Sequence, residues 1–142
     1  MYKPMRTQLG LTLMELMVVV VIVGILAGIV YPSYKSHIAK TRRATAGACL
    51  MEFGQFMERI YTTNMTYKTN NKVEVVLPEG GCKQDLEPYY QFKLVKDQTT
   101  FTLTASPVNS QSDDTCGALT LNQLGVRTAG GKSDATTIRA CW

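Results

Sequence analysis

The sequence predicts an α+β fold in which a long N-terminal helix packs by its second half on an antiparallel β-sheet. Three observations lead to this prediction. An apolar run of membrane length extends from Leu11 to Tyr31, a stripe with helical spacing follows it, and alternating apolar and polar segments fill the C-terminal half. The first half of the helix should span a membrane, and Pro32 should kink the helix because proline removes an intrahelical donor.

Glu15 is the ionisable side chain inside the apolar run. Eleven Leu, Ile and Val residues lie between Leu16 and Val30, and together they favour the bilayer by roughly 3 to 7 kcal/mol. A glutamate near the helix end costs about 2.5 to 3 kcal/mol or less. Insertion is therefore favourable, and the carboxylate is left in need of a partner, which indicates a functional site.

Two simpler interpretations of this segment are a secretory signal and a single-span anchor. Lys3 and Arg6 could form a basic n-region or hold the N-terminus in the cytoplasm, and Ala27-Gly28 offers small residues for cleavage. Glu15 would spoil the apolar core of a signal peptide. Neither alternative explains a glycine five residues before this glutamate.

The segment Gly10-Leu11-Thr-Leu-Met-Glu15 resembles the prepilin peptidase motif of type IV pilins. The resemblance implies cleavage between Gly10 and Leu11 and N-methylation of Leu11. It also implies that Glu15 neutralises the N-terminal ammonium of a neighbouring subunit and so fixes axial register in a filament. Gly24 and Pro32 match positions where pilin helices melt or bend.

Two features depart from the usual pilin pattern. The processed residue is usually Phe and is Leu11 here, and the residue before the glycine is usually basic, whereas Leu9 is apolar. The departures put the efficiency of cleavage in doubt more than its position. Met5 is an alternative start to Met1, because it would give a more ordinary short leader.

The pilin resemblance implies a leader (1–10), a transmembrane and filament-core helix (11–34) and one globular head (35–142), and length and composition agree with this division. Of its 142 residues, 15 are Lys or Arg and 11 are Asp or Glu, which gives a net charge of +4. Removing Lys3 and Arg6 with the leader lowers this to 4 − 2 = +2. Such a small charge argues for no particular polyanionic partner.

The helix should continue beyond Pro32 to about Tyr61, where Thr62-Thr63-Asn64 favours a turn. Apolar residues recur at intervals of three and four, the spacing of one buried face. These residues are Ala46, Cys49, Leu50, Phe53, Phe56, Met57 and Ile60.

The rest of the chain has the pattern of antiparallel strands joined by turns rich in Gly, Asn and Pro. One face of the resulting meander should be apolar and should pack on the helix stripe. The predicted strands are Val73–Leu77, Tyr89–Val95, Thr100–Ala105, Ala118–Asn122 and Val126–Thr128, with 96–99 as a hairpin loop and 122–125 as a turn.

Four cysteines suggest two disulfides formed in an oxidising compartment, and four cysteines allow three connectivities. The pilin resemblance implies that Cys116 and Cys141 bound a disulfide-closed C-terminal D-region, which leaves Cys49 for Cys82. The alternative is that Cys49 is a free core cysteine. The absence of close cysteine pairs and the single histidine argue against a zinc site.

The segment from Cys116 to Arg127, the glycine-rich loop after it and Cys141-Trp142 look like the minor pilins of the PilE-like group of type IVa systems. The resemblance implies a low-abundance subunit that primes or decorates a pilus. It also implies major and minor pilins, prepilin peptidase and the assembly platform as partners, and a single-pass bacterial inner-membrane protein that ends in an extracellular pilus. Trp142 is expected to cover the adjacent disulfide.

Composition and motifs do not favour an enzyme, a metal site or a cofactor. His37 has no acidic partner at a recognisable spacing, and the chain has no nucleophile elbow or phosphate-binding glycine loop. We expect His37 to lie on a solvated basic helix face, which includes Lys35, Lys40, Arg42 and Arg43. Asp113-Asp114 could bind calcium in a pseudopilin of a type II secretion system, but a solvated loop is the preferred interpretation.

Assembly as a pilus subunit that supports motility, adhesion or DNA uptake is the main functional hypothesis, and DNA reception in natural transformation is its strongest competitor. Basic residues on the helix could bind phosphates but would be covered by neighbouring heads in a filament. Better candidates are exposed cations in the head, which lack interleaved aromatics. They are Lys93, Lys96, Arg127, Lys132 and Arg139, with Arg127, Lys132 and Arg139 as the predicted DNA contacts.

We expect the protein purified from its native host to begin at methylated Leu11. Glycine at position 10 leaves the backbone open to the protease, and its neighbours provide the rest of the motif. Mass spectrometry of the N-terminal peptide measures this directly. An intact Met1, or a start near Ile29, would contradict the pilin interpretation.

Overall fold

The computed structural model describes residues 12–70 and 73–142, and these form two compact units. The first unit comprises residues up to His37 and the second extends from Ile38 to Trp142. Helix α1 (Leu13–Asn64, 52 residues) contributes to both units. Each unit is described separately below.

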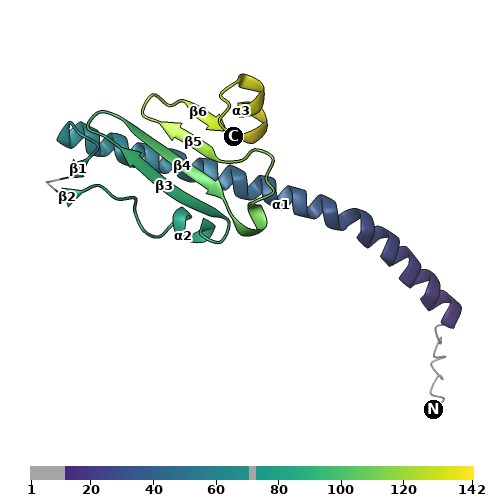
Figure 1. The fold of residues 1–142 in the computed structure, drawn as a ribbon. Helices are drawn as coiled ribbons and strands as arrows, with labels where there is room; N and C mark the ends of the chain where they lie inside the picture. The colour runs from purple at the N-terminus through teal and green to yellow at the C-terminus, as the bar shows by residue number, and fades with distance from the viewer. Residues whose placement is uncertain (1–11, 71–72) are drawn as a thin grey trace, which may run out of the picture. The chain divides into compact units, whose positions relative to one another are not determined.

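In the first unit, α1 (purple to blue in Figure 1) is a single helix, and its apolar side chains are exposed on every face. The large hydrophobic residues from Leu13 to Tyr34 are between 49 and 79% exposed. By length and composition alone, this helix is suited to cross a membrane. The helical assignment continues through Pro32, and the kink expected there stays a prediction.

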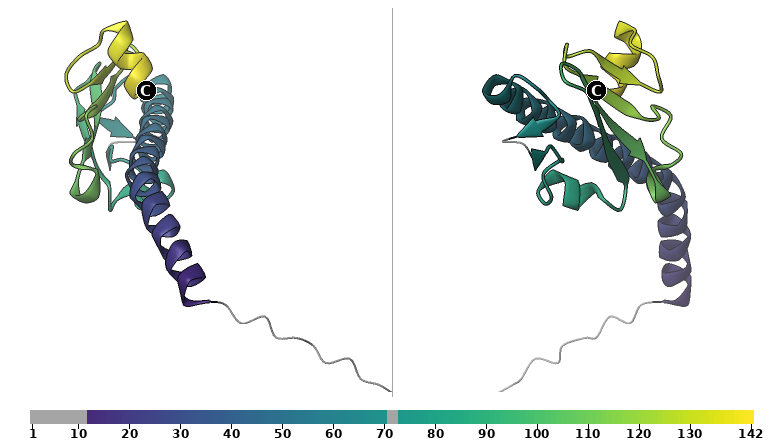
Figure 2. Two further views of the ribbon diagram at one scale, coloured as in Figure 1. Left: turned by 90° about the vertical axis from the view of Figure 1, so that its right-hand side faces the viewer. Right: turned by 60° about the vertical axis from the view of Figure 1, so that its left-hand side comes forward.

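In the second unit, the rest of α1 packs on a four-stranded antiparallel sheet, as predicted (Figures 1 and 2). Viewed edge-on in the left panel of Figure 2, the sheet forms one layer alongside the helix. The strands are β3 (Tyr90–Lys96), β4 (Phe101–Pro107), β5 (Leu119–Asn122) and β6 (Arg127–Ala129), in that spatial order.

The alternation along each strand separates a core face from an outer face. On β4, Phe101, Leu103 and Ala105 are buried, and on β5 the same holds for Leu119 and Leu121. The intervening positions form a polar row across the sheet, because strand register aligns them. This row contains Lys93, Thr104, Thr120 and Thr128.

The helix stripe meets the core face at close range. Phe53 of α1 contacts Phe92 of β3 edge to face, with ring centroids 5.6 Å apart. Gly54 lies so near Leu121 that a Cβ atom at position 54 would come within 3.0 Å of the leucine Cδ2. A glycine inside a helix costs about 1 kcal/mol relative to alanine, and here it allows the sheet to approach.

Helix α1 ends at Asn64, three residues later than predicted. The hydroxyls of Thr62 and Thr63 donate to the carbonyls of Glu58 and Arg59, at 2.8 and 3.1 Å, so these residues satisfy their hydroxyls inside the helix. Met65, with φ of 55°, then terminates it.

The strand predicted at 73–77 is much shorter. Only β2 (Val73–Glu74) pairs, and its partner is the short strand β1 (Thr69–Asn70), which was not predicted. Val75 and Leu77 point into the core without sheet pairing. Their alternation therefore reflects burial alone.

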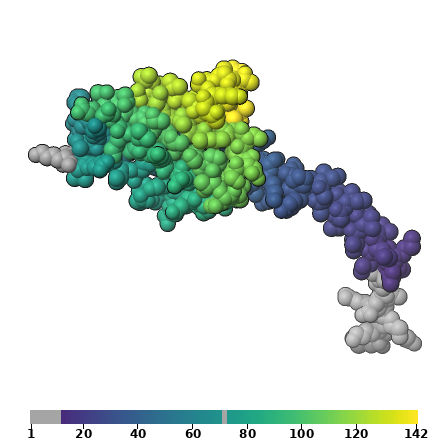
Figure 3. Space-filling view, viewed as in Figure 1, coloured from purple at the N-terminus to yellow at the C-terminus, as the bar shows by residue number. Residues whose placement is uncertain are grey.

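Three short helical elements were not predicted. They are α2 (Cys82–Leu86), the 3-10 turn η1 (Asn109–Gln111) and α3 (Ala135–Cys141). The signal for α3 was present in the sequence, because Asp134 accepts from the amide of Thr137 at 2.9 Å as an N-cap. Figure 3 shows this C-terminal segment on the surface of the second unit, in yellow.

Both predicted disulfides are present. Cys49 pairs with Cys82, with Cα atoms 5.8 Å apart, and Cys116 pairs with Cys141 at 5.7 Å. The alternative of a free Cys49 is therefore wrong. The first bridge fastens α2 to α1, and the second fastens α3 to the loop before β5.

Candidate functional site

The predicted processing site, Gly10 and Leu11, lies outside the described residues. Glu15 lies in the first turn of α1 and is exposed. Its amide donates to the Thr12 hydroxyl at 3.2 Å. Thr12 therefore caps the helix, in a Thr-x-x-Glu arrangement typical of a capping box. Sequence reasoning missed this cap, and the acidic side chain also matches the positive end of the helix dipole.

The two glycines of the membrane-length segment make no close contact within the described residues. A Cβ atom at Gly24 or Gly28 would meet nothing within 4 Å. Together with the exposed apolar side chains around them, this leaves the segment without a partner in its own unit. The melting or bending role expected for Gly24 and Pro32 stays a prediction.

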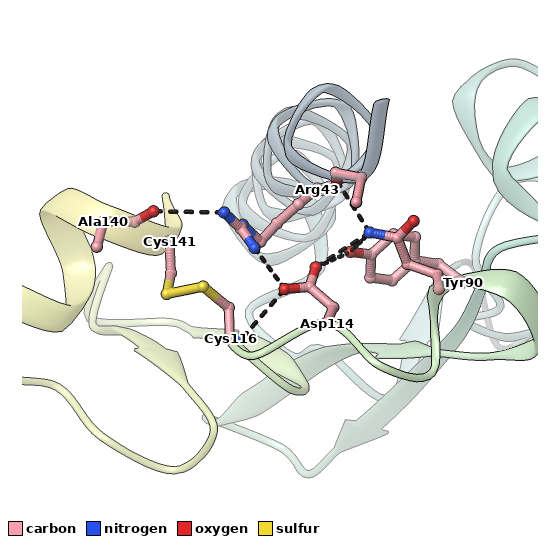
Figure 4. A network of polar contacts seen from close by, with 8 residues as sticks. Arg43, Tyr90, Asp114, Cys116, Ala140 and Cys141 are labelled. Carbon is pink, nitrogen blue, oxygen red and sulfur yellow. Dashed lines mark hydrogen bonds and ion pairs between the residues drawn. A yellow bond between two sulfur atoms is a disulfide. The ribbon is translucent and has the colours of Figure 1, made fainter. Parts of the chain in front are cut away.

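The second unit contains a buried polar network centred on Asp114 (Figure 4). The Asp114 carboxylate forms an ion pair with Arg43 of α1, and the two side chains are 1 and 10% exposed. It also accepts from the Tyr90 hydroxyl at 3.0 Å and from the Cys116 amide at 3.0 Å. The Gln111 amide donates to the same carboxylate at 3.1 Å.

These contacts connect four parts of the chain. Gln111 also donates to the carbonyl of Ala39 on α1 at 2.9 Å. The Arg43 guanidinium reaches toward the carbonyl of Ala140 on α3, at 3.5 Å, and Figure 4 shows it between Asp114 and the Cys116–Cys141 bridge. The network therefore joins the start of the head helix to β3, to the loop before β5 and to the C-terminus.

The network sets the protonation states of its members. Burial opposes the charged form of Asp114, but bonds from the Cys116 amide and Gln111 and the charge of Arg43 outweigh it, so the pKa of Asp114 lies below its usual value. Burial first, and then the negative charge of Asp114, raise the pKa of Tyr90. At neutral pH the carboxylate is charged and the phenol is a neutral donor.

Two sequence expectations are wrong at this network. Arg43 was assigned to a solvated basic face, and Asp114 to a solvated loop, yet both side chains are buried. Arg43 precedes Ala46 and Gly47 by three and four residues, so it continues the core stripe. That spacing could have identified it.

Among the described residues there is no cluster of acidic, His or Cys side chains that could hold a metal ion.

The three predicted DNA contacts lie on three successive parts of the C-terminal segment. Arg127 of β6 has its guanidinium 5.3 Å from the centre of the Trp142 ring and 3.2 Å from the Met51 sulfur. Lys132 lies in the turn before α3, and Arg139 lies on α3 itself. All three are exposed and belong to the segment that follows β5.

The other basic candidates are differently placed. Lys93 is exposed on the outer face of the sheet, whereas Lys96 donates to the Val75 carbonyl and pairs with Glu74 at 3.3 Å. Arg42 stacks on Tyr89, 3.5 Å from the ring centre. Lys40 is exposed and lines the same cleft as Lys132. That Lys40 and Lys132 line one cleft had no signal in the sequence.

Trp142 fastens the C-terminus to the rest of the second unit. Its indole NH donates to the Thr128 carbonyl at 2.9 Å. Its ring lies against Gly47 of α1, where a Cβ atom would be 3.3 Å from the ring. The terminal residue therefore contacts both the helix and β6, in addition to standing next to the disulfide it was expected to cover.

Two family models match the chain. Residues 32–120 match the model described as "Type IV minor pilin ComP, DNA uptake sequence receptor", and residues 5–31 match the "Prokaryotic N-terminal methylation motif". The first match includes Arg43 and Asp114. It ends before Arg127, Lys132 and Arg139, so it does not test these residues.

Individual proteins give similar results. Fimbrial protein EcpB of Eikenella corrodens is 52% identical over 77 residues, which is 54% of this chain and 38% of that protein. A type IV pilin of Shewanella oneidensis is 30% identical, with a TM-score of 0.51 over 68% of this chain and 98% of that one. The minor pilin PilV of Neisseria meningitidis is 28% identical, with a TM-score of 0.51 over 70% and 94%. The matched region spans between 25 and 38% of the length of the first curated relatives.

Replacing Asp114 by Asn should lower the free energy of unfolding at neutral pH by about 3 to 5 kcal/mol, because Arg43 keeps a buried charge without its carboxylate. The folded-state pKa of Asp114 lies below its unfolded value of about 3.9. Its contribution is therefore present above that value and is lost as the pH falls through the folded pKa.

Urea titrations of the full chain in detergent at about pH 7 and pH 3 measure this effect. The difference between wild type and Asp114→Asn should shrink at the lower pH. The matched control is Asp113→Asn, an exposed neighbour whose change should stay within about 0.5 kcal/mol. Equal effects of the two variants at pH 7 would contradict a stabilising ion pair.

Proposed function

The chain belongs to the family of type IV minor pilins described as ComP, DNA uptake sequence receptor, and on that premise we propose that it is a minor pilus subunit whose head binds DNA for uptake. The match over residues 32–120 is the observation on which the proposal depends. As a type IV pilin, the chain is a structural subunit that assembles with other pilins. DNA reception by this particular head is the part that requires a test.

We propose the following route to the filament. Prepilin peptidase cleaves after Gly10 and Leu11 is methylated, while the helix holds the chain in the bacterial inner membrane with its N-terminus in the cytoplasm. The assembly platform then moves the subunit into a pilus formed mainly by the major pilin. The methylation-motif match at residues 5–31 and the exposed apolar side chains of α1 support this route.

Glu15 should act in assembly because it is an acidic group in a segment that must leave lipid and enter a protein core. The incoming N-terminal ammonium of a neighbour is its charge complement. An unpaired ammonium in an apolar core would be costly. The capping contact with Thr12 uses the Glu15 backbone amide and leaves the carboxylate for such a partner.

Replacing Glu15 by Ala should ease membrane insertion yet largely abolish incorporation into filaments. The ratio of subunit in sheared pili to subunit in the membrane fraction measures this, in cells that also express the major pilin. Glu52→Ala is the matched control, because Glu52 is an exposed glutamate of the same helix in the second unit. Incorporation of Glu15→Ala at the control level would mean that the carboxylate has no assembly role.

Several features of the head support DNA binding. Arg127, Lys132 and Arg139 are exposed in one C-terminal segment, and Lys40 shares a cleft with one of them. Cations that neutralise phosphates release counterions, and this provides a binding free energy that does not depend on sequence. The guanidinium of Arg127 beside the Trp142 ring adds a planar group suited to base or phosphate contact.

If the head is a sequence-reading receptor, selection from a random duplex library on the full chain in detergent should enrich one sequence. At about 150 mM salt, this sequence should bind at least about 10³-fold more tightly than a scrambled duplex. Replacing Arg127 or Arg139 by Gln should weaken that preference. Lys68→Gln is the control, since Lys68 is paired with Asp97 at 2.7 Å. Weak binding that ignores sequence and vanishes with salt would leave only the assembly function.

A further inference from the structure

We infer that the cleft between α1, the Cys116 loop and α3 binds a phosphate group of the DNA backbone. This inference rests on the proposed function and adds a specific contact to it. It requires that Lys40 stay accessible in the filament, against the expectation that neighbouring heads cover the basic residues of the helix. The cleft has a volume of 630 Å³, which lies within the range of about 300 to 1,000 Å³ usual for ligand sites. Its residues come from four segments that only the tertiary structure brings together.

The charge of the cleft favours an anion. Lys40 and Lys132 stand in its lining, and the buried Arg43 contributes to the same surface. Neither lysine takes part in an ion pair within residues 12–70 and 73–142, whereas Arg43 is neutralised by Asp114. Asp134 is the nearby acid, and it is engaged as the helix cap, with the charge of Lys132 lowering its pKa after the bonds from Thr137. Counting Lys40, Lys132 and Arg43 against Asp114 and Asp134, the cleft and the residues beside it keep a net charge of 3 − 2 = +1.

Hydroxyl donors complete the chemistry. Thr115 and Thr136 are exposed in the cleft lining, and their hydroxyls can donate to phosphate oxygens. The Thr137 hydroxyl cannot do so at the same time, because it donates to Asp134 at 2.7 Å. Two ammonium groups and two hydroxyls form a set of donors, and neither ammonium is in a salt bridge within the described residues, although Asp134 lies near Lys132. A phosphodiester, which offers only acceptors and one negative charge, suits this set.

The cleft is built on rigid parts of the head. The Cys116–Cys141 bridge lies in the wall of the cleft. Arg43 connects this wall to α1 through its ion pair with Asp114 and its hydrogen bond to the Ala140 carbonyl. Gly117 and Gly130 pack against each other, where an added Cβ on Gly117 would lie 3.3 Å from the Gly130 Cα. Both have positive φ, at 59 and 55°. The lysines are thus carried by fixed backbone, which reduces the cost of ordering the site on binding.

The salt dependence of DNA binding tests the inference. Full chain in detergent is titrated with a fluorescent duplex of about 16 base pairs, the selected sequence or, failing that, a random one, over about 50 to 300 mM salt. The double variant Lys40→Gln/Lys132→Gln should reduce the slope of log K against log salt by about 0.9, the contribution of one phosphate, and each single variant should reduce it by less. Lys93→Gln is the matched control, because Lys93 is an exposed lysine on the outer face of the sheet.

A second measurement separates the cleft from the proposed function. Pyrophosphate is the probe, and protection of lysines from acetylation by an amine-reactive reagent is read by mass spectrometry. Protection of Lys40 and Lys132, but not Lys93, supports the cleft even if no duplex binds, in which case DNA reception alone fails. Duplex binding with a slope unchanged in the double variant overturns the cleft while DNA reception stands. Absence of both duplex binding and pyrophosphate protection overturns the cleft as well.

Discussion

The packing of one helix face against one sheet face determines how the head of this pilin is organised. From Arg43 to Ile60, α1 presents residues at three- and four-residue intervals to the core face of β3, β4 and β5. Because every other residue of a strand faces the helix, the outer face of the sheet is left polar. Because Gly47 and Gly54 have no Cβ atom, the C-terminal tryptophan and the sheet can come close to the helix. An alanine at position 54 would require the Leu121 side chain to shift, and an alanine at position 47 would require the Trp142 ring to move by a few tenths of an ångström.

Arg43 lies at the end of this packed stripe and belongs to the buried polar network centred on Asp114. A buried guanidinium is tolerated because Asp114 neutralises it and three further donors satisfy the carboxylate. Breaking such a pair is much more costly than never having it, so the pair restricts where the loop before β5 can lie. The Cys116–Cys141 bridge then extends this restraint to α3. The residues proposed to contact DNA in the C-terminal segment are consequently displayed on a fixed part of the head, although Arg127, Lys132 and Arg139 belong to an edge strand, a turn and a short helix.

The two parts of α1 meet different physical requirements. The first is apolar on all faces and has no partner among the described residues of its own unit, so lipid or other helices must supply one. The second has its partner in the same chain. One carboxylate, Glu15, lies in the first part, and most of the charge lies in the second. This separation allows one chain to assemble through its helix and to present a ligand-binding surface through its head.

Local pattern was enough to predict the helix, the four strands of the main sheet and the apolar anchor, because the spacing of apolar residues along the chain indicates which positions are buried. The motif at Gly10 and Glu15 identified the family, and the family resemblance implied the disulfide pairing that the structure contains. The short helices were missed because five to seven residues carry too little periodicity, although Asp134 marked the start of α3. Residues paired across long separations were beyond the reach of the sequence. Arg43 and Asp114 are 71 positions apart, and Lys40 and Lys132 line one cleft only because the sheet, the loop before β5 and the C-terminal helix pack on α1. The sequence by itself therefore determined what kind of molecule this is, and the tertiary structure decided which charges are buried and which are left to bind, because burial of a charge depends on neighbours brought close by packing of the whole chain.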